Sequence, residues 1–223
     1  MIASLPPGRT RSQILGSPRL TGVVVARVDG ARKPIPATSH IVSCDTLLLA
    51  AGLVPENRLA LSTGMALDRA TGGPTVSQDR ETSIPGIFAC GNGLYVHDLV
   101  DNVSREGQIA GRAAARYALQ GKAGATSLAS LSAGRNIRCV VPQRLVEPPA
   151  GAEPLRLAFR VSRPVRSVQL VIKDQDGQPI LAASRRYLAP AEVCYLTLTE
   201  VALKKIRPGA SLTLEAISRE GMP

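Results

Sequence analysis

The chain has 223 residues, of which 44% are hydrophobic, 20% charged and only 3% aromatic, with no tryptophan. This composition is ordinary for a globular protein, and it requires a core built from Val, Leu, Ile and Ala. No apolar run reaches the roughly 18 residues of a membrane helix, and residues 1–16 lack the apolar block of a signal peptide, so we expect a cytoplasmic protein without a membrane span.

The net charge is +10, and the basic excess lies at both ends of the chain. A nucleic-acid-binding protein usually concentrates Lys and Arg on one face, often with aromatic stacking platforms. Here the basic residues are scattered, and adjacent pairs such as Arg185-Arg186 and Lys204-Lys205 are rare. We therefore expect a basic surface without a nucleic-acid partner, and we keep nucleic-acid binding as the weakest alternative.

The four cysteines are isolated and form no Cys-x-x-Cys pair: Cys44, Cys90, Cys139 and Cys194. Their spacing argues against a zinc site and against the dithiol centre of a thioredoxin-reductase-type enzyme, and we predict no metal site. Isolated cysteines in apolar surroundings usually pack as small buried residues. We expect this of Cys90 and Cys194, with packing favoured over redox activity for Cys90.

The first predicted strands form a hairpin. The first twenty residues show no periodicity and predict an irregular start. β-Branched residues predict a strand over 22–28, and Asp29-Gly30 is a turn signal. Residues 39–43 can return as the second strand of an antiparallel pair.

Two short apolar runs and a helix follow. Residues 45–51 (Asp-Thr-Leu-Leu-Leu-Ala-Ala) end at Gly52 and predict a strand buried on both faces. Residues 84–90 form a second such run before Gly91-Asn92. Over 98–120 apolar residues recur at helical spacing, with Asp101 or Asn102 as the expected cap.

The last part of the chain has the alternation of β-strands. Residues 123–134 are small and polar and predict a linker. Beyond them, alternating apolar residues such as those over 155–161, and the hairpin turn at 174–177, predict short strands. Their regular spacing predicts a small all-β sandwich over 135–223.

The two apolar runs, in this order, resemble motifs of FAD-dependent oxidoreductases of the pyridine nucleotide-disulfide reductase-like superfamily, which have two dinucleotide-binding domains. The run ending in Ala51-Gly52 is similar to their Ala-Thr-Gly-type motif, with Ala51 in place of Thr. Residues 82–92 (Thr-Ser-Ile-Pro-Gly-Ile-Phe-Ala-Cys-Gly-Asn) are similar to the flavin-contacting motif Thr-x-x-x-x-φ-φ-Ala-x-Gly-Asp, with Asn92 in place of Asp. Residues 91–101 resemble a bacterial subgroup often found beside glycerol-3-phosphate-oxidase-like and amine or imino-acid dehydrogenase partners.

This resemblance implies an α/β fold in which an incomplete FAD/NAD(P)-binding Rossmann-like domain precedes the small all-β sandwich-like domain. Residues 1–48 are then the tail of the NAD(P)-binding domain, a β-hairpin. Residues 49–122 are the C-terminal half of the FAD-binding domain. Residues 123–134 are the linker, and residues 135–223 are the β-rich C-terminal domain.

The resemblance also implies FAD as cofactor. Gly91 would let the backbone approach the flavin, and Asn92 would accept a hydrogen bond from a ribityl hydroxyl. The start of the following helix would stabilise negative charge on the reduced pyrimidine ring. The cofactor-binding candidates are Ala51, Gly52, Gly91, Asn92, Val100, Asp101, Asn102 and Val103.

No catalytic residue is assigned. His97 is a candidate proton donor, or a residue that shapes the flavin site, and the alternative is a loop histidine bonded to the backbone. Asp98 and Asp101 allow an acid/base pair, although helix capping is favoured.

Neither the Gly-x-Gly-x-x-Gly loop for the FAD pyrophosphate nor that of an NAD(P) domain is present. We therefore expect the back half of a longer enzyme that uses FAD and NAD(P), with weak FAD binding by this chain alone. Its partner would be the missing N-terminal half or another oxidoreductase subunit. The expected function is transfer of electrons between a flavin and NAD(P)H or a partner flavoprotein. The alternative is a non-enzymatic remnant or interaction module whose β domain docks a partner.

Overall fold

The computed structural model describes residues 8–31, 33–49, 52–121, 127–147 and 154–219. The chain divides into two compact units, residues 1–52 and residues 53–223. Its content is mixed and mostly β, with one long helix in the second unit.

The first unit is a three-stranded antiparallel sheet. Strands β1 (Arg9–Leu15), β2 (Gly22–Arg27) and β3 (His40–Ser43) lie in the order β1-β2-β3, and the 3-10 turn η1 (Pro36–Thr38) precedes β3. The predicted hairpin is therefore confirmed as β2 and β3. Strand β1 was missed, and the irregular start predicted for the first twenty residues was wrong there, because an exposed strand with polar side chains has no apolar alternation.

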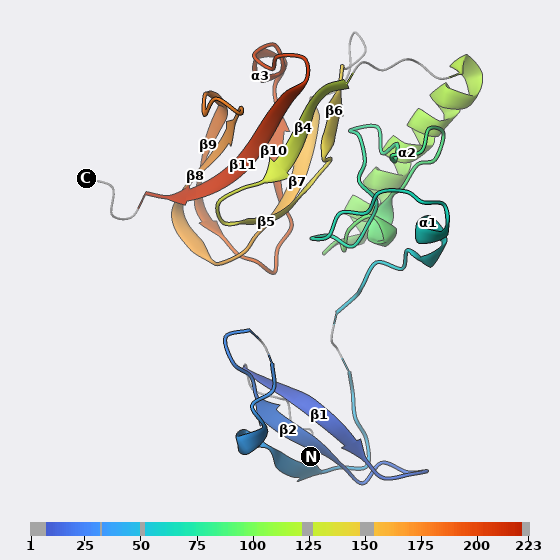
Figure 1. The fold of residues 1–223 in the computed structure, drawn as a ribbon, viewed down its shortest axis with the longest axis vertical. Helices are drawn as coiled ribbons and strands as arrows, with labels where there is room; N and C mark the ends of the chain where they lie inside the picture. Colours follow the sequence, from blue (N-terminus) through green and yellow to red (C-terminus); the bar gives the residue numbers. More distant parts are fainter. Residues whose placement is uncertain (1–7, 32, 50–51, 122–126, 148–153, 220–223) are drawn as a thin grey trace. The chain divides into compact units, whose positions relative to one another are not determined.

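The second unit contains two sheets that form a sandwich (Figure 1). Strands β10 (Cys194–Leu198), β7 (Leu155–Val161) and β5 (Ile137–Val141) form the smaller sheet in that order. The larger sheet has the order β6-β4-β11-β8-β9 and is mixed, since β4 and β11 are parallel. Its strands are β6 (Arg144–Val146), β4 (Ser127–Ala133), β11 (Ala210–Ser218), β8 (Val165–Lys173) and β9 (Pro179–Leu188).

The alternating apolar residues of these strands meet in one core. Leu157, Phe159, Leu170, Ile172 and Leu214 are among its fully buried side chains. Such residues stabilise a fold by about 1.5–3 kcal/mol each on burial. A short helix, α3 (Glu200–Leu203), lies between β10 and β11, and the Thr199 hydroxyl caps it by accepting from the Ala202 amide.

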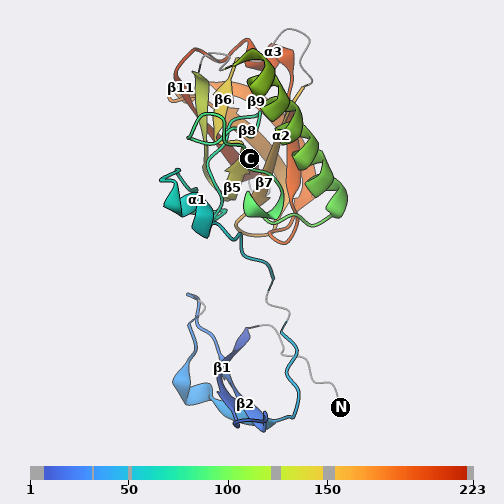
Figure 2. The same ribbon diagram turned by 90° about the vertical axis from the view of Figure 1, so that its right-hand side faces the viewer.

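Residues 53–121 pack onto this sandwich. They include the short helix α1 (Arg58–Ser62), the 3-10 turn η2 (Gly91–Gly93) and the long helix α2 (Val100–Gln120), which runs beside the sandwich in Figure 2. Buried side chains from both parts form a second cluster, made of Val76, Leu94, Tyr95, Val141 and Ala158. The helix predicted over 98–120 is confirmed as α2.

Three predicted elements were wrong. Residues 127–133, assigned to the linker, form β4. The strand was missed because its buried residues, Leu128, Ala129 and Leu131, alternate only partly with small polar residues. Residues 45–49 form no strand, and Leu48 and Leu49 are 81% and 63% exposed. No strand of the described chain pairs with them, so an apolar run alone could not make a buried strand.

Residues 84–90 also form no strand. Pro85 and Gly86 turn the chain, with Gly86 at φ +80°, and only the isolated bridge between Glu81 and Phe88 remains. Cys90 is exposed rather than packed in a strand, and Cys194 is half-buried. The thiol of Cys139 is buried, and that burial raises its pKa.

Candidate functional site

The segment that carries the flavin-like motif is a loop held against α2. Thr82 is buried, and its hydroxyl accepts a hydrogen bond from the Ile84 amide at 3.2 Å. Gly86 lies directly against the Tyr117 ring of α2, since a Cβ built on it would be 3.0 Å from that ring. Phe88 packs edge-on against the same ring, with centroids 6.1 Å apart. The motif is therefore positioned by α2.

At the end of this loop, Gly91 and Asn92 begin the turn η2. Gly91 is buried and has φ +66°, a conformation that favours glycine. A Cβ built on it would be 3.4 Å from Val103 of α2. Asn92 is exposed, and its side-chain oxygen accepts from the His97 amide at 3.1 Å. The amide group of Asn92 thus lies at the surface, with its NH₂ group outside this bond.

The start of α2 lies beside this turn. Its N-cap is Leu99, and no side chain caps the helix, so neither Asp101 nor Asn102 has the capping role predicted for them. Leu99 and Val100 are 64% and 74% exposed. Amide groups at an uncapped helix start carry partial positive charge and attract anionic groups. The turn and helix start together form an exposed surface with apolar side chains and available backbone donors.

Asp98 anchors this region to the sandwich. Its carboxylate accepts from the Arg160 guanidinium of β7 at 2.5 Å and from the Val193 amide at 2.6 Å. These bonds hold the chain just before α2 to strand β7 and to the segment just before β10. The acid/base pair considered for Asp98 and Asp101 is therefore replaced by a structural role for Asp98.

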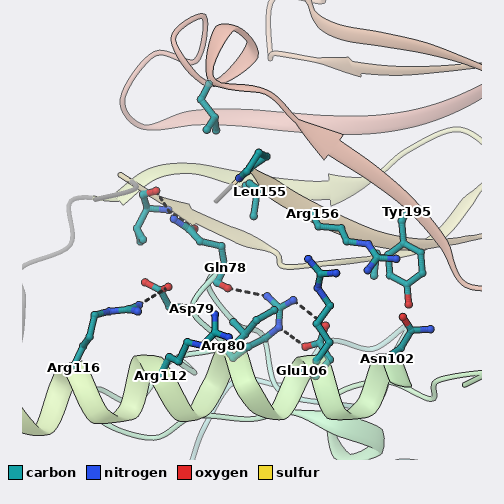
Figure 3. Close-up of a pocket in the computed structure, with 16 residues that line it drawn as sticks. Gln78, Asp79, Arg80, Asn102, Glu106, Arg112, Arg116, Leu155, Arg156 and Tyr195 are labelled. Atoms are coloured by element: carbon teal, nitrogen blue, oxygen red, sulfur yellow. Dashed lines mark hydrogen bonds and ion pairs between the residues drawn. The ribbon is translucent and has the colours of Figure 1, made fainter. Parts of the chain in front are cut away.

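A buried ion pair lies directly behind the motif. Arg80 and Glu106 form a bidentate pair, and their side chains are 3% and 8% exposed (Figure 3). The Tyr95 hydroxyl donates to Glu106 at 3.3 Å, and burial raises the pKa of Tyr95. The carbonyl of Arg80 accepts from the Ala89 amide at 2.9 Å. This pair joins the motif loop to the second turn of α2, and the sequence motifs did not identify it.

His97 is also buried, with its ring stacked on Tyr95 at 4.0 Å between centroids. Neither ring nitrogen has a hydrogen-bond partner among the described residues. Burial in these surroundings lowers the pKa of His97. The neutral form of the imidazole is therefore favoured at pH 7. A proton donor needs a polar group that receives the proton, and the ring contacts none among the described residues.

We expect the stability of the protein to fall as the pH drops below about 6.5 because of His97, whose pKa is lowered by burial in the folded chain. The unfolded chain takes up this proton near the ordinary pKa of histidine, whereas the buried ring does so only at lower pH. The unfolded state then binds more protons, so the free energy of unfolding decreases. Denaturant titrations at several pH values measure this slope.

His97→Gln removes the slope, whereas His40→Gln, at an exposed position in the first unit, keeps it. An unchanged slope in His97→Gln would contradict the assignment of this pH dependence to the buried ring.

The structure brings together most of the predicted cofactor-binding residues. Gly91, Asn92, Val100, Asp101 and Val103 all lie at η2 or the start of α2, and Asn102 faces the sandwich from the same turn. Gly52, at φ +85° and exposed, belongs to the first unit. Ala51 lies outside the described residues.

Two further observations bear on the site. The described part of the chain contains no cluster of three His, Cys, Asp or Glu side chains suited to a metal ion. No helix among the described residues is both long and apolar enough to cross a membrane.

Comparison with known proteins gives one partial similarity. No protein-family model matches the chain. The chain is 38% identical over 77 residues to CtmF of Castellaniella defragrans, a probable ferredoxin reductase. The similar stretch is 33% of this chain and 18% of that protein, so the chain spans less than a fifth of that relative.

Proposed function

We propose that this chain is part of an FAD-dependent oxidoreductase that moves electrons between a flavin and NAD(P)H or a partner flavoprotein. The similarity to a probable ferredoxin reductase supports this class of activity. The chain supplies the ribityl and pyrimidine side of the flavin site, within the C-terminal half of a Rossmann-like domain. The missing N-terminal half, or a partner oxidoreductase subunit, supplies the phosphate loops.

One observation carries the proposal: the glycine of the motif has positive φ and lies directly beside an uncapped, exposed helix start. A flavin accepts and donates electrons through its ring system when bound. The backbone donors of Val100 and Asp101 are suited to hold its carbonyl oxygen and to stabilise negative charge there. The exposed Leu99 and Val100 side chains offer an apolar surface for the ring. Asn92 offers the side-chain amide that would meet a ribityl hydroxyl.

Flavin binding tests this function. A ¹⁵N-labelled sample titrated with FAD is expected to show saturable shifts in the amides of Gly91, Asn92 and residues 100–103. Binding is expected to be weak, because the residues that hold the pyrophosphate in such enzymes are missing here. The Gly177 amide, in the turn between β8 and β9, serves as the internal control and should not move.

Two variants at one position sharpen the test. Asn92→Asp keeps a side-chain acceptor and should keep FAD binding, whereas Asn92→Leu should weaken it severalfold. Absence of shifts around Gly91 with FAD present at millimolar concentration would overturn the flavin-site proposal. In that case the alternative of an interaction module, with the β sandwich as its docking surface, would be favoured.

A further inference from the structure

A cavity of about 230 Å³ lies between α2 and the strands β7 and β10. Figure 3 shows the side chains that project into it from both sides. Its size is close to the lower end of small-molecule pockets, which start near 300 Å³. Leu99 and Val100 at the start of α2 are exposed and do not line the cavity, whereas Asn102 of the same turn does.

The wall of this cavity is strongly basic. Five arginines line it against two carboxylates, Asp79 and Glu106. Each of these carboxylates already forms an ion pair with an arginine of the wall. Arg105 and Arg156 have no carboxylate partner in the part of the chain that the structure describes. Among the described side chains, the cavity therefore presents positive charge at Arg105 and Arg156 that no carboxylate neutralises.

Arg156 is held in a defined orientation. Its guanidinium lies over the Tyr195 ring, 3.5 Å from the centroid. Such stacking uses the face of the guanidinium and leaves its N–H edge for hydrogen bonds. Arg156 is half-buried, so an anion bound to it would be partly shielded from water.

Tyr195 adds a polar group without a partner. Its hydroxyl oxygen is buried and makes no hydrogen bond with the described residues, although it is close to the Tyr95 hydroxyl. Burial raises the pKa of Tyr195, so the hydroxyl keeps its proton and can donate. A buried hydroxyl without a partner costs about 1–3 kcal/mol, which a ligand acceptor would offset.

The remainder of the lining is apolar and includes Ile109 of α2, Leu155 of β7 and Leu203 of α3. We propose that this cavity binds a small aliphatic carboxylate, whose head group meets Arg156 and Tyr195 and whose hydrocarbon chain lies against Ile109, Leu155 and Leu203. This site is distinct from the proposed flavin site: Asn102 of the helix start is part of the cavity lining, but the contacts proposed for the carboxylate involve neither Gly91, Asn92 nor the backbone amides of residues 100–103.

The test uses hexanoate as probe on the full chain without flavin. Hexanoate is expected to cause saturable shifts in the methyl signals of Ile109, Leu155 and Leu203. Hexylamine, hexanol and inorganic phosphate at equal concentration should not do so, because each lacks either the carboxylate or the chain. Failure here leaves the FAD titration unaffected, so the two proposals fail separately.

Three variants decide which atoms bind. Arg156→Gln should raise the Kd for hexanoate at least about tenfold. Tyr195→Phe, which keeps the ring beneath Arg156, should raise the Kd for hexanoate severalfold. This second variant keeps the proposal testable if Arg156→Gln does not fold. Arg138→Gln, at an exposed position on β5, should leave it unchanged. The proposal is overturned if hexanoate gives no saturable methyl shifts, if hexylamine gives equal shifts, or if Arg138→Gln weakens binding as much as Arg156→Gln.

Discussion

Replacement of Glu106 with alanine is expected to lower the free energy of unfolding by about 3–5 kcal/mol. The variant leaves the Arg80 guanidinium buried without its counter-charge, and it also removes the acceptor of the Tyr95 hydroxyl. The pair joins the motif loop to α2, so the loop should open together with the helix. Denaturant unfolding followed by circular dichroism measures the loss.

Two matched variants separate the charge from the packing. Glu200→Gln removes a carboxylate from an exposed pair with Lys204 and should change the stability little. The double variant Arg80→Met with Glu106→Leu removes both charges and should recover much of the stability lost in Glu106→Ala. Equal losses in the single and double variants would show that the uncompensated charge is not the cause.

Glu106 illustrates which part of the site the sequence could not predict. It lies three residues after Val103 and four before Ala110, on the stripe that α2 buries, and it is the charged member of that stripe. A carboxylate on a buried helix face requires a partner. The position of Glu106 on this stripe therefore indicates that a basic side chain is buried beside it. The partner, Arg80, is 26 residues away in an irregular loop, and no local pattern could identify it.

The strands, too, were predicted only in part. Alternation predicted the sandwich strands around Leu157, Phe159, Leu170 and Leu214, because one face of each strand packs in the core. The same reasoning failed for residues 45–49. There the apolar run has no neighbouring strand in the described chain, and periodicity carries no information about neighbours.

The sequence motif around Gly91 was recognised, but its backbone conformation was predicted wrongly. Its sequence matched a strand ending in Gly-Asn, yet the chain forms a turn-rich loop that is held by Tyr117 and by Arg80. What the resemblance did imply is a shared site for Gly91 and the start of α2, and the two lie close together, since a Cβ built on Gly91 would be 3.4 Å from Val103. That proximity follows from the few residues between them and from the positive φ that glycine allows.

Replacement of Gly73 with alanine is expected to lower the free energy of unfolding by about 3 kcal/mol or more. Gly73 is buried, and a Cβ built on it would lie 1.9 Å from the carbonyl oxygen of Leu94 and 2.8 Å from that of Gly93. Both contacts are backbone atoms, so the clash is relieved only when one chain segment moves. Thermal and denaturant unfolding measure the loss.

The displaced segment would be the turn η2, because Asn57 ties the loop of Gly72 to Gly93 through hydrogen bonds of 2.8 and 2.9 Å. Gly73→Ala should therefore also shift the amide signals of Gly91 and Asn92 in the folded protein. Gly107→Ala is the matched control, since a Cβ there meets nothing within 4 Å and alanine favours the helix by about 0.5–1 kcal/mol. A Gly73→Ala variant as stable as the parent chain would contradict the close contact between the Gly73 loop and Leu94. It would also contradict the inference that this loop holds the turn η2, and with it Gly91, beside α2.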